Sequence, residues 1–156
     1  MGKKIFIFVF LLFLSSCGYE AIHSKKNKKN YDFSISEVKF IGDREVNLKI
    51  KERLNNYTLV EKNKDFTLKI SSNLKKLILI KDDAGDATNF KIEITSNIDI
   101  FSDTKLKSNF IIVESFDYNN NSDKFELKSY EREIKNNLAN TISEKLIFKL
   151  AKVQWY

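Results

Sequence analysis

Three consecutive segments of the chain alternate apolar and polar residues with a period of two. They read FTLKISSNLKKLILIK (66–81), FKIEITSNIDIF (90–101) and LKSNFIIVESFDY (106–118). Because successive side chains of a β-strand point to opposite faces, each segment predicts a strand with one buried face. That face should carry the apolar residues of one parity: Phe66, Leu68, Ile70, Leu74, Ile78, Ile80, Phe90, Ile92, Ile94, Ile98, Ile100, Leu106, Phe110, Ile112, Phe116 and Tyr118.

The lengths of these segments and of the connections between them indicate how the strands pair. At 12 to 16 residues, the segments exceed the usual strand length of about 5–6, so we expect them to extend beyond the helices that cover the sheet. The connections KDDAGDAT (81–88) and SDTK (102–105) are short enough for hairpins, which predicts an antiparallel meander. The first connection also gathers Asp82, Asp83 and Asp86, but it lacks the spacing and the closing Glu of a calcium loop, so a solvated hairpin tip is expected.

Two segments show the period of an amphipathic helix. In GDREVNLKIKERLNNY (42–57), apolar residues recur every four positions from Val46 to Leu54, and Asp43 is a suitable N-cap. In FELKSYEREIKNNLANTISEKLIFKLAK (125–152), the same spacing continues over the whole segment, with Ser122 as a candidate cap. The apolar stripe of this second helix is Tyr130, Ile134, Leu138, Ile142, Leu146 and Leu150, widened by Leu127, Ala139 and Ile147.

A further strand is expected ahead of the first helix. FSISEVKFI (33–41) is rich in β-branched and aromatic residues, although its apolar phase slips between Ile35 and Val38. A β-bulge at Glu37 or a late start of the strand would explain the slip. The element order is then βαβββα, which predicts an α+β fold: a two-layer sandwich in which a four-stranded, mostly antiparallel sheet carries two helices on one face.

The N-terminus reads as a signal peptide. Two lysines precede ten apolar residues, 5–14, and the last of these begins the sequence LSSC (14–17), which ends in Cys17. Ten residues span about 15 Å as a helix, which is too short for the hydrocarbon core of about 30 Å. We therefore expect a signal peptide over residues 1–16, a lipidated N-terminus and flexible basic tether over 17–32, and a single α+β domain over 33–156.

Composition excludes several classes of function. A single cysteine and a single histidine, His23, leave no set of residues for a transition-metal site, and no catalytic cluster or glycine-rich phosphate loop is present. The sequence therefore predicts a protein that is not an enzyme and has no metal or other cofactor. The net charge of +6 favours an anionic partner. Several lysines share the polar parity of the predicted strands, at positions 69, 75, 91, 105 and 107, with Lys76 and Lys81 close to the first hairpin.

LSSC, ending in Cys17, resembles the lipobox of bacterial lipoproteins. The chain as a whole resembles the LPS-assembly lipoprotein family (LptE). The resemblance rests on the lipobox with the following CGY, on ISEVKFIGDREVNLKIKERL (35–54), on the three-stranded meander, and on FDYNNNSDKFELKSYEREIKNNLANTISEKLIFKLA (116–151). It extends from Cys17 to Val153.

The resemblance implies a lipoprotein whose Cys17 carries acyl chains such as palmitate and which is held at the periplasmic side of a Gram-negative outer membrane. It implies that the domain associates with the large LPS-assembly β-barrel as a plug and chaperone and binds lipopolysaccharide during its insertion. The candidate lipopolysaccharide-binding residues are Lys75, Lys76, Lys81 and Lys91. Nucleic acid is not an expected partner. The alternative is an auxiliary lipoprotein subunit of an ABC-type lipid transport system.

Overall fold

The structure is a computed structural model that describes residues 31–58, 62 and 64–153. The expected signal peptide, Cys17 and the tether up to residue 30 lie outside the described residues. In the order of the chain, the elements are β1 (Ser34–Gly42), α2 (Arg44–Leu54), the short 3-10 helix η1 (Asn55–Tyr57), β2 (Asp65–Lys81), β3 (Ala87–Ser102), β4 (Lys105–Asn119) and α3 (Lys124–Lys152).

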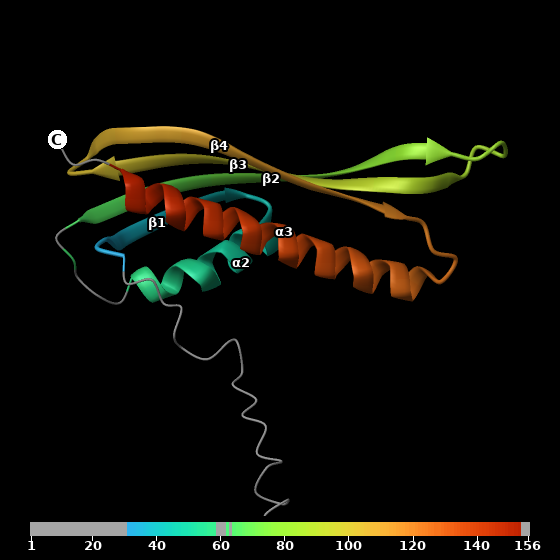
Figure 1. Ribbon diagram of the computed structural model, residues 1–156, viewed down its shortest axis with the longest axis horizontal. Coiled ribbons are helices and arrows are strands. Elements are labelled where there is room, and N and C mark those ends of the chain that lie inside the picture. Colours follow the sequence, from blue (N-terminus) through green and yellow to red (C-terminus); the bar gives the residue numbers. More distant parts are fainter. Residues whose placement is uncertain (1–30, 59–61, 63, 154–156) are drawn as a thin grey trace, which may run out of the picture. The chain divides into compact units, whose positions relative to one another are not determined.

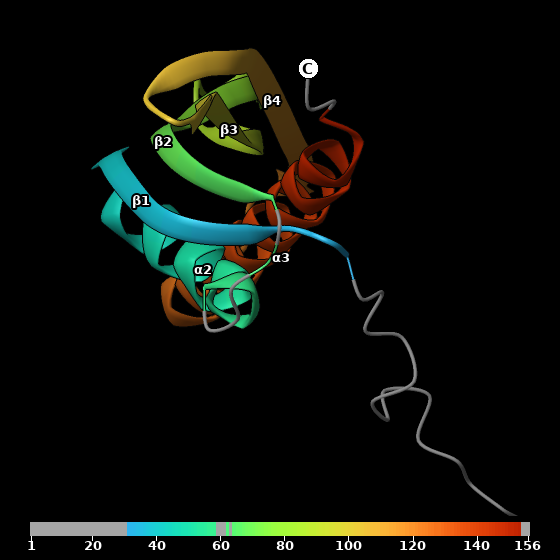
Figure 2. The same cartoon turned by 90° about the vertical axis from the view of Figure 1, so that its left-hand side faces the viewer.

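The four strands form one sheet in the order β1-β2-β3-β4. β1 pairs with β2 in parallel, and β2, β3 and β4 form the expected antiparallel meander. Both helices lie on the same face of the sheet, and the sheet curls around α3 (Figures 1 and 2). This arrangement confirms the predicted α+β fold with the order βαβββα.

The phase slip of the first strand is a β-bulge. Ile35 pairs with Phe66 and Glu37 pairs with Thr67, so Ser36 is the extra residue on β1. The bulge moves the apolar side chains from odd to even positions, because an inserted residue shifts the alternation by one. It keeps both Ile35 and the partly buried Val38 and Phe40 in contact with the core.

The hydrophobic core lies between the sheet and the two helices. Val46, Ile50 and Leu54 of α2 are buried as predicted, and Asp43 caps this helix by accepting a hydrogen bond from the backbone N–H of Val46 at 3.0 Å. The fully buried large side chains are Phe66, Ile35, Ile50, Leu54, Leu68, Ile70, Ile92, Ile94, Ile98, Ile100, Ile142 and Leu146. These residues come from β1, β2, β3, α2 and α3, so residues 31–153 contain their own core.

The prediction of one continuous buried face is wrong at the strand ends. Ile78 and Ile80 are 53% and 58% exposed, and Leu106 and Phe116 are also exposed. At the end that carries the β2–β3 hairpin, the reason is length: the 17 residues of β2 extend about 56 Å at about 3.3 Å per residue, whereas the 29 residues of α3 cover about 44 Å. The β2–β3 hairpin therefore protrudes beyond the helical layer, as its length predicted (Figure 1). Leu106 lies at the other end, beside the β3–β4 turn.

The start of α3 also corrects two expectations. Its N-cap is Asp123, whose carboxylate accepts from the backbone N–H groups of Phe125 and Glu126, and not Ser122. Tyr130, the first residue of the predicted stripe, is 45% exposed. The rest of the stripe is buried or partly buried as predicted. Tyr130 lies at the end of the helix where the covered part of the sheet gives way to the protruding hairpin.

Candidate functional site

The four candidate lysines, Lys75, Lys76, Lys81 and Lys91, lie in the protruding half of the sheet, but they do not share one surface. Lys75 and Lys91 have odd numbers and therefore lie on the outer face of the sheet, opposite to the helices. Lys76 lies on the helical face. Lys81 is the last residue of β2, where the strand enters the hairpin tip.

Lys76 belongs to a polar network on the helical face of the sheet, centred on the carboxylate of Glu131. The Nζ of Lys76 lies 2.6 Å from Oε1 of Glu131 on α3, and Tyr118 on β4 donates its hydroxyl hydrogen bond to the same oxygen at 2.7 Å. The ammonium also lies 4.1 Å from the centroid of the Phe90 ring, which stacks on Tyr118. Three elements, β2, β4 and α3, are thus joined at one carboxylate.

The network shifts the protonation equilibria of its members. Burial raises the pKa of the Glu131 carboxyl, but the hydrogen bonds from Lys76 and Tyr118 and the charges of Lys76 and Lys135 outweigh it, so the pKa lies below its ordinary value of 4.5. Burial raises the pKa of the Tyr118 hydroxyl, and its hydrogen bond to Glu131 raises it further. At neutral pH Glu131 is therefore an anion, Tyr118 is a neutral donor, and the charge of Lys76 is compensated.

The outer-face lysines lie beside acidic neighbours. Lys75 is directly opposite Glu93 on β3, and the Nζ of Lys91 lies 3.6 Å from Oδ1 of Asp117 on β4. Such exposed pairs contribute at most about 1 kcal/mol and exchange readily with solvent or with another anion. The Lys91 side chain is no more exposed than that of Lys76, at 29% against 39%. Lys75 and Lys91 are more available to an anionic ligand because their pairing is looser than that of Lys76 with Glu131.

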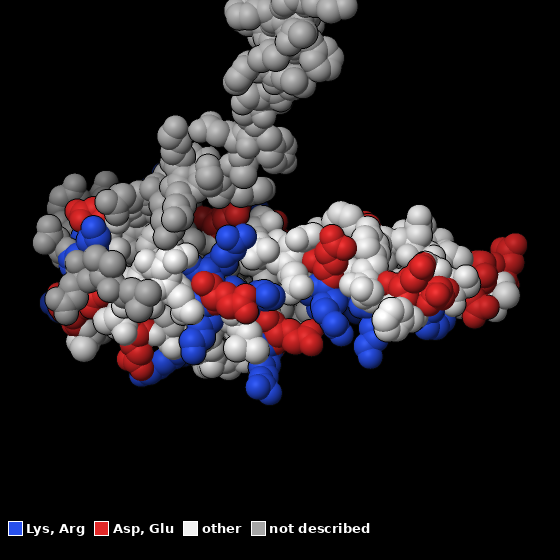
Figure 3. Space-filling view, turned by 90° about the horizontal axis from the view of Figure 1, so that it is seen from below, with Lys and Arg blue, Asp and Glu red and all other residues white. Residues whose placement is uncertain are grey.

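The tip of the hairpin is acidic. Asp82 accepts hydrogen bonds from the backbone N–H groups of Ala84 and Asp86, at 3.0 and 2.8 Å, so its carboxylate closes the turn. Within the described residues, no group of three His, Cys, Asp or Glu side chains is placed to hold a metal ion. Figure 3 shows the helical side of the molecule, where acidic side chains gather at the hairpin end and both signs alternate elsewhere.

A cleft of about 780 Å³ lies between the end of β4 and the start of α3. We call it the hairpin cleft; it is lined by Asn89, Phe116, Asp117, Tyr118, Asn119, Asn120, Asn121, Ser122, Glu126, Leu127 and Tyr130. Its charged lining residues are Asp117 and Glu126, and most of the others are amides and aromatic rings. The four candidate lysines lie outside this lining, so the hairpin cleft offers hydrogen bonds and ring surfaces and not positive charge.

The roles of Glu131 and Tyr118 in the Lys76 network were not predicted from the sequence, although the sequence carries a signal of them. Glu131 occupies a position between Leu127 and Ile134 on the buried stripe of α3, and Lys76 shares the parity of the buried residues of β2. A charged residue at an apolar position is buried only with a partner. Two such residues of opposite sign could therefore have been paired before the fold was known.

The fold and these surfaces define a class: a two-layer α+β domain of order βαβββα with a protruding hairpin. No protein-family model matches the chain, and no curated protein matches it. Solved structures do resemble it. The rare lipoprotein B from Shewanella oneidensis superimposes with a TM-score of 0.52 at 17% identity, covering 72% of this chain and 95% of that chain.

Two further structures have the same fold. A minor lipoprotein from Acinetobacter baumannii has a TM-score of 0.50 at 16% identity, covering 74% of this chain and 90% of its own. Lipoprotein B from Nitrosomonas europaea has a TM-score of 0.51 at 10% identity, covering 82% and 88%. At these identities the likeness shows the shared fold.

Proposed function

We propose that this chain is a non-enzymatic lipoprotein of the outer membrane, anchored on the periplasmic side, that associates with the LPS-assembly β-barrel as a plug and chaperone. It binds lipopolysaccharide while that lipid is inserted. The observation that carries the proposal is the fold of Ser34–Lys152, which resembles solved structures named as lipoproteins, in a chain whose N-terminal sequence ends an apolar run with LSSC.

Membrane attachment in this proposal depends on Cys17. Among the described residues, no helix is long and apolar enough to cross a membrane. A diacylglycerol on the thiol and an acyl chain on the new N-terminus would supply the anchor, since each buried methylene contributes about 0.8 kcal/mol and several chains hold stably. The basic stretch after Cys17 would add attraction to anionic headgroups.

The outer face of the sheet suits a plug inside a hydrated lumen. Its middle carries short polar side chains that can bond to water or to a surrounding protein: Asn73, Thr95, Asn97, Asn109 and Ser115. Exposed Ile111 and Val113 on β4 add apolar contact area beside them. A face of this kind is compatible with a wet, tightly fitted interface.

The proposed lipopolysaccharide contacts are the lysines of the protruding half. Lys75 and Lys91 on the outer face and Lys81 at the end of β2 would contact phosphates of the lipid. Lys76 is held by Glu131 at 2.6 Å, so it would reach the lipid only if that ion pair opened. The lysines of the outer face and of the tip therefore form the first set to test.

The first experiment is affinity purification of the full-length protein from detergent-solubilised membranes, followed by identification of its partner. Recovery of a large outer-membrane β-barrel supports the proposal, and its absence refutes it. Recovery of an inner-membrane ATPase complex would support the alternative, an auxiliary subunit of an ABC-type lipid transporter. A Cys17→Ser variant should lose incorporation of labelled palmitate and leave the membrane fraction.

A second experiment measures lipopolysaccharide binding by the same protein at low and high salt. Replacement of Lys75, Lys81 and Lys91 by Glu should weaken binding at least about tenfold at low salt, with a smaller effect at high salt. The matched control reverses three exposed lysines elsewhere on the domain: Lys39, Lys51 and Lys69. If both triple variants bind equally, the lysines of the hairpin are not the site.

A further inference from the structure

A second cleft lies at the opposite end of the domain, between the beginning of β4 and the last turns of α3. Its volume is about 700 Å³, and we call it the C-terminal cleft. It is lined by Lys107, Ser108, Asn109, Phe110, Lys145, Phe148, Lys149, Lys152 and Val153, which include four lysines and no carboxylate. Of these residues, the proposed function uses only Asn109, on the outer face of the sheet.

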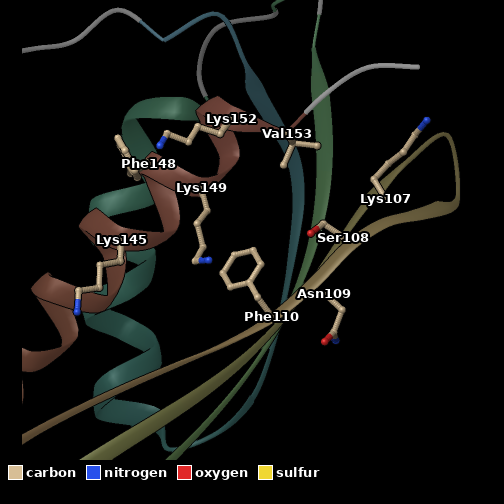
Figure 4. A pocket seen from close by; sticks show the side chains of 9 residues that line it. All are labelled: Lys107, Ser108, Asn109, Phe110, Lys145, Phe148, Lys149, Lys152 and Val153. Carbon is tan, nitrogen blue, oxygen red and sulfur yellow. The ribbon is translucent and has the colours of Figure 1, made fainter.

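The helix contributes a basic and aromatic stripe to this cleft. Lys145, Phe148, Lys149 and Lys152 have the spacing i, i+3, i+4 and i+7, which places them on one face of α3, beside the buried stripe. Figure 4 shows Lys149 extending toward Phe110 on β4, whereas Lys107 and Asn109 point away from the helix. The chemistry of the C-terminal cleft therefore comes from α3 together with Phe110.

Lys149 and Lys152 lie over aromatic rings instead of beside carboxylates. The Nζ of Lys149 lies 4.6 Å from the centroid of Phe110, and that of Lys152 lies 3.9 Å from the centroid of Phe148. Within the part of the chain that the structure describes, neither forms an ion pair, whereas Lys145 is paired with Glu114. An ammonium over a ring face keeps N–H donors directed to the other side, where an anionic oxygen can bind.

The cleft also offers apolar surface. Phe148 is 49% exposed, and the half-buried Phe110 and Val153 also line the cleft. A small inorganic anion would leave this surface in contact with water. A nucleic-acid base needs a free ring face to stack on, and an ammonium already occupies one of the two faces of each phenylalanine, which restricts stacking to the other face. An acyl chain has no such requirement and only needs apolar area.

We infer that the C-terminal cleft binds the phosphate-bearing headgroup of an anionic lipid, with Lys149 and Lys152 on the phosphate and Phe148 against the first part of an acyl chain. The site is separate from the hairpin lysines. Phe110 pairs with Ile98 on β3, seven residues from Lys91, which corresponds to about 23 Å along the strand. The inference does not depend on the barrel partner, and it stands or falls independently of the proposed function.

The test is native mass spectrometry of the full-length protein released from dodecyl maltoside, titrated with dioleoyl phosphatidylglycerol or with dioleoyl phosphatidylcholine. We expect binding of phosphatidylglycerol in preference to phosphatidylcholine. The variant Lys149→Gln/Lys152→Gln should need about tenfold more phosphatidylglycerol for half-saturation, because two lysines near an anionic headgroup are lost. The control Lys51→Gln/Lys128→Gln removes the same charge from exposed positions and should remain within about twofold of the parent.

Two further measurements separate the possible sources of phosphate and exclude a merely structural role. Phe148→Ala should weaken lipid binding about fivefold, and inorganic phosphate at equal concentration should not compete. Competition by phosphate together with an unaffected Phe148→Ala variant would overturn the lipid assignment. Lys149 and Lys152 also face the negative end of the α3 dipole, so thermal melts are needed. Lower melting temperature with unchanged lipid binding would mean that these lysines serve only the helix, and the inference would be wrong.

Discussion

Gly42 marks a point where β1 and β2 approach too closely for any side chain. It ends β1 with a φ of +93° and is directly opposite Ser72. A Cβ at this position would lie 1.9 Å from the carbonyl oxygen of Ser72. The same oxygen accepts the backbone N–H of Asp43 at 2.8 Å, and Asp43 is the N-cap of α2. Gly42→Ala therefore affects the strand pairing and the start of the helix together.

The size of the effect follows from these contacts. The left-handed backbone costs an alanine roughly 1–2 kcal/mol. The backbone of Ser72 must also move, which breaks the hydrogen bond from Asp43, worth about 1 kcal/mol, and disturbs an N-cap worth about 1 kcal/mol. Gly42→Ala should therefore lower the free energy of unfolding by about 3 kcal/mol or more.

Gly85 in the β2–β3 turn provides the matched control. Its φ is +88°, almost the same as that of Gly42, but a Cβ there would meet no atom within 4 Å. Gly85→Ala should therefore pay only the backbone cost of roughly 1–2 kcal/mol. Urea denaturation of both variants measures the difference, with an unchanged m-value showing that the midpoints are comparable. Equal destabilisation of the two variants would refute the close approach at Gly42.

Three further predictions concern the core, the cap and the partly buried carboxylate of Glu131. Ile142→Ala should cost about 2–5 kcal/mol, because this fully buried side chain leaves a cavity under the sheet; a loss below 1 kcal/mol in urea denaturation would contradict its place in the core. Asp123→Ala should cost about 1 kcal/mol, and Asp123→Asn should restore most of it in the same assay. Glu131→Gln should lower stability by about 1–3 kcal/mol at pH 7. Since the folded-state pKa of Glu131 is lowered, its contribution is complete above the ordinary value of 4.5 and disappears as the pH falls through the folded value. The stabilities of the parent and Glu131→Gln should therefore converge in acid, and a constant difference down to pH 2 would show that ionisation is not involved.

Local patterns were sufficient to predict the elements of the fold. The two-residue period of the strands and the four-residue period of α3 follow from backbone geometry alone, and even the bulge beside Glu37 left a visible slip in the apolar phase. The cap of α3 was placed one residue early, at Ser122 instead of Asp123, because both residue types satisfy the same N–H groups and only the helix start distinguishes them.

The candidate site was predicted less completely. Lys75 and Lys91 lie on the outer face that their parity indicated. Lys76 lies on the other face and is paired with Glu131, which is 55 residues away in the sequence. Such a pairing depends on where α3 crosses the sheet, and neither element encodes that position by itself. The stripe of Lys149 and Lys152 with Phe148 was also present in the sequence, but its meaning depends on the nearness of Phe110.

The sequence by itself therefore determined which residues alternate, which helices are amphipathic, and in which order the elements follow, because these properties depend on neighbours a few positions away. The tertiary structure alone decided how far the helical layer reaches along the strands. A helix advances about 1.5 Å per residue and a strand about 3.3 Å. The length of strand that α3 leaves uncovered therefore depends on how the helix and the sheet pack together. That difference leaves Ile78 and Ile80 exposed on the hairpin.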